Sequence, residues 1–530
     1  MITTARNLVP WEGLEPSIPR GNAILSRARI PFRHHGICAS YLFHGAKKRK
    51  KRYSVISMQE FSTFIFDSYD FNPEDRTINL RYSLDGDTNF IETITLPEEM
   101  PINAEHPDLD KALFALHLMG GISYYKTCLP KTIQILSGAL SPAAAMFWND
   151  VYENGLGEFF YKNDIDFRGL IRFPSVEIKD STPPSPNPQV PSPTPASWLG
   201  GKFPGHSVLV PIGGGKDSVV TMEMLKNTGF EVTLLRIGQH PLIDATAATA
   251  RLPLWNVKRG LSKKLFEMNA EGALNGHVPI TGYLSCLSVV IAILSGRTDI
   301  AFSNEASANI GNVEFHGKQI NHQWSKSLAF EKMFQEYIEK FITGDVRYFS
   351  LLRTFSELKI TEMFCLYPKY FPVTTSCNTN WKIVKTPQPR RAAAGDSITQ
   401  EHPFPGAALW CGVCPKCAFV FAMMGAFLPK EKVLTIFGKN LFADEMLLPL
   451  YRELLGLEGF KPFECVGTPE ETTAAFLLAH NKGEYEGDAV MKMFIDEVLP
   501  EDTEPDEMIG EALMPNKEHS IPKDFQYLLI

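Results

Sequence analysis

Apolar and polar residues follow a period-two pattern in the first part of the chain. Two stretches at 77–84 and 89–96 alternate as half-buried strands do, and Asp85-Gly86 between them predicts a hairpin turn. Ser141 followed by Pro142 is typical of the cap and the first position of a helix. An apolar helix is expected near 109–119 and a strand at 132–136. Together these patterns predict a small α+β domain.

A different pattern follows, in which short apolar runs alternate with helical segments. Such an alternation predicts a parallel sheet with helices on both faces. Ligands of such sheets bind beyond the carboxyl ends of the strands, so we expect a site where the strands at 208–212 and 299–303 end. The predicted strands are 208–212, 231–236 and 299–303, and the predicted helices are 219–226, 282–295 and 330–342.

Prolines separate the two patterns. Seven of them between residues 183 and 195 cannot sustain a helix or a sheet and favour an extended linker, so a domain boundary is expected there. A second biased stretch at 386–406 predicts an inserted surface loop. Residues 1–55 show little periodicity and are expected to be loosely ordered. They contain the basic run Lys47 to Arg52.

Composition narrows the possible partners and the compartment. The formal net charge of −8 over 530 residues gives no general attraction to nucleic acid, and we interpret Lys47 to Arg52 as a solvated charge block in preference to a nuclear address or an RNA contact. No apolar run approaches the ~18 residues of a membrane span, and the first residues lack a signal-peptide core. The nine cysteines are odd in number and clustered, which favours metal binding in a reducing compartment. We expect a cytoplasmic protein whose oligomeric state the sequence leaves open.

The loop Gly213-Gly214-Gly215-Lys216-Asp217-Ser218 lies between a predicted strand and a predicted helix. Glycines at the start of a helix let bare backbone N–H groups surround a polyphosphate, and the helix dipole favours the anion. Lys216 would add charge, Ser218 a hydroxyl and Asp217 a contact to Mg²⁺. A simple tight turn is the plainer alternative, and Asp217 excludes the Walker A pattern. The loop resembles the PP-loop of ATP pyrophosphatases, Ser-Gly-Gly-x-Asp-Ser, with Gly213 in place of the leading Ser.

Four cysteines have a spacing typical of metal ligands. Cys411, Cys414 and Cys417 form two Cys-x-x-Cys steps, and Cys377 precedes them. Four thiolates predict a closed, structural Zn²⁺ site, in preference to an iron–sulfur cluster or unligated thiols. The spacing resembles the zinc site of the PP-loop enzymes that make 7-cyano-7-deazaguanine. Among the other cysteines, Cys465 stands in a polar context and is a candidate reactive thiol.

Three polar clusters stand between these two motifs. They begin at Asn275, Ser303 and Asn321, and they are too polar for a core, although loops that cap helices would also explain them. Asn304 and Glu305 are candidate nucleotide-binding residues. The candidates for proton transfer are His277, His322 and Lys326, because an imidazole or a desolvated amine can titrate near neutral pH.

Further short motifs join the glycine loop and the cysteines. The complete run is Gly121-Ile-Ser-Tyr-Tyr-Lys126, Gly155-Leu-Gly-Glu-Phe159, the glycine loop, Asn275-Gly-His-Val-Pro279, Ser303-Asn-Glu305, Asn321-His-Gln-Trp-Ser-Lys-Ser327, Trp410-Cys-Gly-Val-Cys-Pro-Lys-Cys417 and Lys461-Pro-Phe-Glu-Cys-Val-Gly467. This run resembles the UDP-N-acetyl-α-D-muramoyl-L-alanyl-L-glutamate epimerase family over about residues 61–471.

The resemblance implies an enzyme that inverts the terminal L-Glu of UDP-MurNAc-L-Ala-L-Glu, a peptidoglycan precursor, and consumes ATP to AMP and pyrophosphate with Mg²⁺. Adenylation of the α-carboxylate would make the neighbouring Cα–H acidic enough for an enzyme base, and water would then release the product. His277, His322 and Lys326 form the pool of bases, and Asp217 and Ser218 act at the nucleotide. Two other functions stay open: a carboxylate-adenylating amide or nitrile synthase, and an ATP sensor without catalysis.

The predicted fold class is α/β, with a Rossmann-like parallel sheet of the PP-loop type (adenine nucleotide alpha hydrolase), an N-terminal α+β domain and a zinc-stabilised helical C-terminal part. The predicted parts are an extension at 1–55, the α+β domain at 56–180, the proline-rich linker at 181–200, the nucleotide-binding domain at 201–370, the four-cysteine region at 371–430 and a helical region at 431–530.

Overall fold

The computed structural model describes residues 61–177, 206–381, 409–459, 461–499 and 505–529. The expected extension with Lys47 to Arg52, the proline-rich linker and the inserted loop at 386–406 lie outside the described residues. In the part of the chain that is described, no helix combines the length and the hydrophobicity needed to cross a bilayer.

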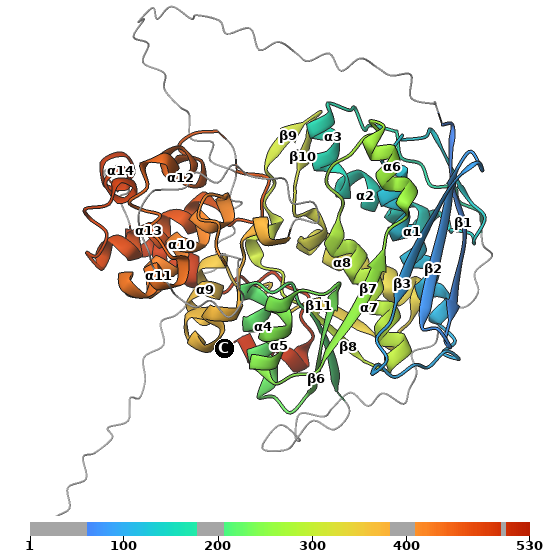
Figure 1. The fold of residues 1–530 in the computed structure, drawn as a ribbon, viewed down its shortest axis with the longest axis horizontal. Helices are drawn as coiled ribbons and strands as arrows, with labels where there is room; N and C mark the ends of the chain where they lie inside the picture. The colour runs from blue at the N-terminus through green and yellow to red at the C-terminus, as the bar shows by residue number, and fades with distance from the viewer. Residues whose placement is uncertain (1–60, 178–205, 382–408, 460, 500–504, 530) are drawn as a thin grey trace, which may run out of the picture. The chain divides into compact units, whose positions relative to one another are not determined.

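A nine-stranded sheet in the order β11-β8-β5-β6-β7-β3-β2-β1-β4 organises the fold (Figure 1). Its first five strands are parallel, which confirms the prediction of an α/β protein with a large parallel sheet. The strands are β1 (Thr63–Asn72), β2 (Thr77–Leu84), β3 (Thr88–Thr95), β4 (Thr132–Ile135), β5 (Ser207–Pro211), β6 (Glu231–Ile237), β7 (Leu254–Gly260), β8 (Asp299–Phe302) and β11 (Arg347–Ser350). A separate ribbon pairs β9 (Val313–Phe315) with β10 (Lys318–Ile320).

Strand β5 shows why the parallel strands are apolar throughout. Leu209 packs into one hydrophobic core, whereas Val208 and Val210 pack into another. Successive side chains of a strand point to opposite faces, and both faces here are covered, so no polar alternation remains. Strands β7 and β11 were not predicted, because both mix polar and apolar residues and neither forms an apolar run.

The N-terminal strands extend the same sheet. Asp85 and Gly86 have φ angles of 51° and 80°, which is the left-handed geometry of a tight hairpin turn, and β2 pairs with β3 as expected. Strand β3 then pairs antiparallel with β7. At this seam the buried Glu92 accepts hydrogen bonds from Arg259 (2.8 Å) and Tyr283 (2.6 Å). The two predicted folding units therefore share one hydrogen-bonded sheet.

Helices pack on both faces of the sheet. The N-cap of α2 is as expected, because the Ser141 hydroxyl accepts from the Ala144 amide (3.2 Å). The helix expected at 330–342 instead ends at Tyr337 and continues as a π-helical turn, Ile338–Ile342. The helices are α1 (Leu109–Tyr125), α2 (Pro142–Gly155), α3 (Gly157–Asn163), α4 (Lys216–Lys226), α5 (Pro241–Ala250), α6 (Lys263–Ala270), α7 (Ile280–Ser295), α8 (Leu328–Tyr337) and α9 (Glu357–Cys365).

The C-terminal part is helical. Helix α10 contacts α9, α11, α12 and α13, so the C-terminal helices form one group that continues the core around α9 (Figure 1). These helices are α10 (Pro415–Phe427), α11 (Lys430–Phe437), α12 (Leu448–Leu454), α13 (Pro469–Asn481), α14 (Ala489–Glu497) and α15 (Pro505–Leu513).

Candidate active site

The glycine loop joins the end of β5 to the start of α4, as its sequence predicts. Gly214 is buried with a φ of 78°, a conformation that side chains rarely adopt, and its carbonyl accepts from the Thr375 amide (3.2 Å). The Gly213 amide donates to the Ser218 hydroxyl (3.3 Å). A Cβ on Gly213 would meet nothing within 4 Å. Gly214 is thus required by the backbone, whereas Gly213 leaves room for the serine of the PP-loop pattern.

A cavity of about 240 Å³ opens above this loop. It lies where the parallel strands β5 and β8 end. The strands that follow β5 in the sequence are added on one side of it as β6 and β7 and on the other side as β8 and β11, so the strand order reverses here. Such a switch point is the usual ligand site of a parallel sheet. The cavity is lined by Gly213, Gly215, Asp217, Ser218, Asn304, Glu305, Lys326, Glu357, Ser376, Asn378, Lys416 and Cys465, among others.

Lys216 has a different position from the one its motif suggests. Its ammonium group is 1% exposed and forms ion pairs with Asp217 and Glu357, and it does not line the cavity. Lys416 does line it, and donates to the other oxygen of Glu357 (2.8 Å). Burial alone would raise the pKa of the Glu357 carboxyl, but the two lysines outweigh it and lower this pKa to about 2. A charged lysine–glutamate–lysine group therefore supports the cavity wall.

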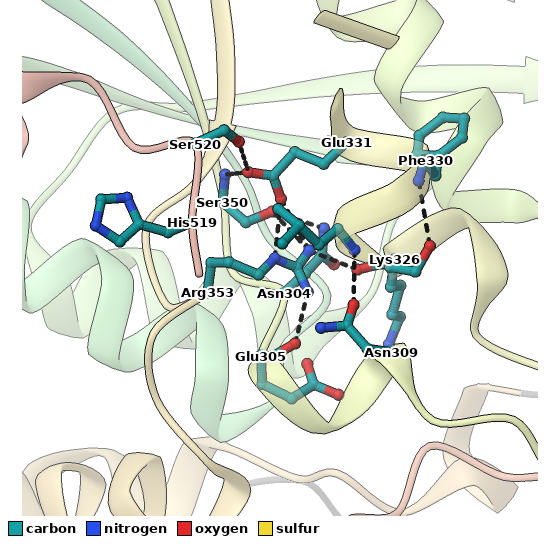
Figure 2. A network of polar contacts seen from close by, with 12 residues as sticks. Asn304, Glu305, Asn309, Lys326, Phe330, Glu331, Ser350, Arg353, His519 and Ser520 are labelled. Atoms are coloured by element: carbon teal, nitrogen blue, oxygen red, sulfur yellow. Dashed lines mark hydrogen bonds and ion pairs between the residues drawn. The ribbon is translucent and has the colours of Figure 1, made fainter. Parts of the chain in front are cut away.

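Arg353 holds two further parts of the site (Figure 2). Its guanidinium is fully buried and donates to the carbonyls of Glu305 (2.6 Å) and Lys326 (2.5 Å) and to the carboxylate of Glu331 (2.8 Å). Asn304, beside Glu305, donates to the Ser350 hydroxyl (2.9 Å). One rigid cation thus positions the segment after β8 and the turn that bears Lys326, so that both side chains reach the cavity.

A second group of titratable residues adjoins the cavity. His322 Nδ1 contacts Glu158 Oε2, and His277 Nδ1 lies 3.4 Å from the same oxygen. Lys326 Nζ donates to Cys465 Sγ (3.3 Å), and His322 also forms a side-chain hydrogen bond with Cys465. Ligand atoms of Glu158, His277 and His322 lie within 4.8 Å of one another. Because Lys162 also pairs with Glu158, we interpret the group as a hydrogen-bonded cluster and not as a metal site.

The protonation states in this cluster differ. Burial and the neighbouring His322 lower the pKa of His277 to about 4. Burial would also lower that of His322, but Cys465 and Glu158 raise the pKa to about 9. The pKa of Lys326 is raised as well, because Cys465 and Glu305 outweigh its burial. At neutral pH, His322 and Lys326 are therefore cations, and His277 is neutral.

The four cysteines meet as their spacing predicts. The sulfur atoms of Cys377, Cys411, Cys414 and Cys417 lie within 4.8 Å of one another, and those of Cys411 and Cys417 are 3.7 Å apart. Tetrahedral Zn²⁺ with Zn–S bonds of about 2.3 Å would separate its sulfurs by about 3.8 Å, so the cluster fits this ion. Cys417 stands in the first turn of α10, one residue from Lys416.

Sequence reasoning missed several residues of this region. Glu158 lies in a motif singled out for its resemblance, yet a carboxylate on an apolar helix gives no local signal of a histidine partner. Lys416 was overlooked because its neighbours are the metal-type cysteines. Ser376 and Asn378 were overlooked for the same reason, because they flank Cys377. Glu158 meets His322, and the other three residues line the cavity, only because distant parts of the chain come together. The periodicity of the sequence does not encode such long-range contacts.

Comparisons with known proteins cover nearly all of the described chain. A family model described as the MurL N-terminal domain matches residues 56–351, and one described as the MurL C-terminal domain matches residues 373–508. A protein of Xanthomonas oryzae pv. oryzae (strain MAFF 311018) is 36% identical over 473 residues, or 88% of this chain and 97% of the relative. A protein of Salinispora tropica is 35% identical over 446 residues, or 83% and 90%. Both relatives are named UDP-N-acetyl-alpha-D-muramoyl-L-alanyl-L-glutamate epimerase.

Proposed function

Since this chain belongs to the MurL family, we propose that it carries out the reaction for which its curated relatives are named. It is an epimerase that converts the terminal L-glutamate of UDP-MurNAc-L-Ala-L-Glu to D-glutamate, in the synthesis of a peptidoglycan precursor. One observation supports the proposed mechanism. The glycine loop lines the same cavity as Lys326 and Cys465, which belong to the cluster of acid–base side chains.

The reaction has a physical obstacle that this arrangement can remove. A Cα–H beside a carboxylate is very weakly acidic, because its removal would add negative charge to an existing anion. In the proposed mechanism, the substrate carboxylate attacks the α-phosphate of ATP, and pyrophosphate leaves. The resulting acyl adenylate is neutral at the carbonyl, so the Cα proton can pass to an enzyme base. Reprotonation from the opposite face inverts the centre, and water releases AMP and the D-glutamyl product.

The glycine loop supports the ATP part of this proposal. Amides at the start of α4 and the Ser218 hydroxyl face the cavity and suit a polyphosphate. The carboxylates of Asp217 and Glu305 line the same cavity and are the oxygen ligands that Mg²⁺ prefers, so these residues fit that ion. Bound there, Mg²⁺ would neutralise phosphate charge. Lys326 and Lys416 supply further positive charge to the cavity.

The resemblance to PP-loop ATP pyrophosphatases belongs to the same proposal. It rests on Gly214, Gly215, Asp217 and Ser218 and on their place after the central strand β5. The four-cysteine cluster would hold structural Zn²⁺, with no ligand position left for catalysis. Its function would be to fix the start of α10 and, through it, Lys416.

Incubation of the protein with Mg-ATP and UDP-MurNAc-L-Ala-L-Glu in D₂O tests the mechanism. We expect AMP, pyrophosphate and a D-glutamyl product that carries deuterium at Cα. An amide or nitrile synthase would release pyrophosphate only with a nitrogen donor, and an ATP sensor would release none. AMP formation with no deuterium in the product would contradict deprotonation at Cα.

A variant connects this reaction to the loop. Asp217→Ala should abolish AMP formation and leave the fold intact, because the side chain is partly exposed at the cavity. The far-ultraviolet circular dichroism spectrum should match that of the unmodified protein. AMP formation at an unchanged rate would exclude Asp217 from the nucleotide site.

A further inference from the structure

Cys465 is the one thiol among the described residues that line the cavity. It stands in the segment before α13 and is half-buried. Two nitrogen-bearing side chains converge on its sulfur: Lys326 Nζ at 3.3 Å, and His322, which forms a hydrogen bond to it. The remaining contact of His322, from Nδ1 to Glu158, orients the ring. In the order Glu158, His322, Cys465, a carboxylate orients an imidazolium that stabilises a neighbouring thiolate.

We propose that Cys465 is a catalytic residue that exchanges the Cα proton of the glutamate on one face of the cavity, and that Glu158 and His322 are positioning residues for its thiolate. The proposal rests on the proposed epimerase function and names the group that moves the proton. The three bases expected from the sequence surround this thiol. His322 and Lys326 contact its sulfur, and His277 contacts Glu158.

The charges around Cys465 support a thiolate. Burial would raise the pKa of the Cys465 thiol, but Lys326, His322 and Lys416 outweigh it and lower this pKa to about 7. Lys461, which is half-buried, also interacts electrostatically with Cys465, and desolvation lowers the pKa of this lysine. His322 and Lys326 keep their protons at neutral pH, so they cannot accept another. Cys465 is the member of the cluster that can gain or lose a proton near neutral pH.

The proton balance is simple. In one direction of inversion, the Cα–H bond of the acyl adenylate breaks and an S–H bond forms, while the electron pair moves into the neighbouring carbonyl. A protonated group or water on the opposite face then delivers a proton to Cα. In the reverse direction, the Cys465 thiol donates. His322 and Lys326 stay protonated throughout, and no oxidant or reductant takes part.

The test separates adenylation from inversion. Cys465→Ser and Cys465→Ala should release pyrophosphate from Mg-ATP and UDP-MurNAc-L-Ala-L-Glu within about threefold of the unmodified enzyme. Formation of D-glutamyl product should fall by about 10²–10⁴-fold, the usual contribution of a positioned proton-transfer group. Cys128→Ser is the matched control, because Cys128 is also half-buried and does not line the cavity. It should retain both activities.

The outcomes that would contradict the proposed function differ from those that would contradict the role of Cys465. If the unmodified enzyme itself forms no D-glutamyl product, the proposed function fails. If it does, and both Cys465 variants invert the substrate within about threefold of it, the assignment of Cys465 is wrong. Pyrophosphate release that falls in parallel with inversion would also overturn it, because the thiol would then serve binding or folding.

The positioning role has its own readout. The rate of alkylation of Cys465 by iodoacetamide, followed on its peptide by mass spectrometry against pH, should give a thiol pKa of about 7. His322→Gln removes a cation from the sulfur, so the thiol pKa should rise toward its ordinary value of about 8.5. Inversion by this variant should recover in part at higher pH. An unchanged thiol pKa would exclude His322 from this role.

Discussion

At the scale of single residues, the glycine loop shows how backbone and side-chain requirements differ within one motif. Gly214 adopts a positive φ and is buried, whereas Gly213 is exposed and has open space at its Cβ position. Three consecutive glycines look equivalent in the sequence. Only the middle one is demanded by the turn.

We therefore expect Gly213→Ser to fold normally and to keep pyrophosphate release, since a Cβ atom at this position meets nothing within 4 Å. Gly214→Ser should lower the free energy of unfolding by about 1–2 kcal/mol and abolish release, because a side chain strains this backbone. Urea unfolding and a pyrophosphate assay would measure both variants. Equal behaviour of the two would contradict the different roles of these glycines.

The pair of His322 and Glu158 predicts a pH dependence of stability. The pKa of His322 is raised in the folded protein to about 9, from about 6.5 in an unfolded chain. Its contribution to stability is therefore complete below about pH 6.5 and is lost as the pH rises through 9. His322→Gln should be less stable than the unmodified protein by on the order of 3 kcal/mol at pH 6, and the difference should shrink by pH 9.5.

Urea unfolding at a series of pH values would measure this difference, with His106→Gln, at a half-buried histidine far from this cluster in the sequence, as the control. A difference that stays constant from pH 6 to pH 9.5 would show that the imidazole gains no favourable interaction as a cation.

At the scale of elements, one buried residue coordinates segments that are far apart in the sequence. Arg353, which follows β11, fixes the segment after β8 and the turn before α8 (Figure 2). Site residues on irregular segments need such support, because the backbone of these segments lacks the regular hydrogen bonds of a helix or a sheet.

Arg353→Met should lower the free energy of unfolding by about 3–5 kcal/mol, because it leaves the buried Glu331 carboxylate without its cation. Lys340→Met removes an ion pair between two exposed side chains, Lys340 and Glu336, and should cost less than about 1 kcal/mol. Chemical denaturation would compare the two variants. An equal, small effect would show that Glu331 finds another partner.

The four-cysteine cluster lies at the start of α10. Cys414 is the N-cap of this helix, and Lys416 in its first turn reaches the cavity. We expect about one zinc per chain by elemental analysis. Cys414→Ser, or removal of zinc by a chelator, should lower both the melting temperature and pyrophosphate release. Absence of zinc together with unchanged stability of the variant would contradict the four-cysteine assignment.

At the scale of the whole molecule, the continuous sheet joins the N-terminal strands to the five parallel strands. Strand β3 supplies the hydrogen-bonding partner of β7, and α1 packs against α7. A fragment of residues 201–530 would expose the edge of β7 and the apolar surface of α7. We expect this fragment to aggregate on expression, as judged by size-exclusion chromatography. A soluble, cooperatively unfolding fragment would show that the two parts fold separately.

The sequence by itself determined the local elements and the chemistry of the motifs. The strand at β5, the hairpin at Asp85-Gly86, the cap at Ser141 and the approach of Cys411, Cys414 and Cys417 all follow from neighbours in the chain, because turns, caps and closely spaced ligands are short-range features. The family resemblance likewise depends on residues within short motifs.

Only the tertiary structure decided how these parts meet. It placed Lys216 against Glu357 instead of in the cavity, brought Lys416 into that cavity, and set Cys465 between His322 and Lys326. It also continued the parallel sheet into the N-terminal strands through β3 and β7. These contacts join residues more than a hundred positions apart, and the free energy that selects them comes from packing and charge pairing, which no periodicity along the chain encodes.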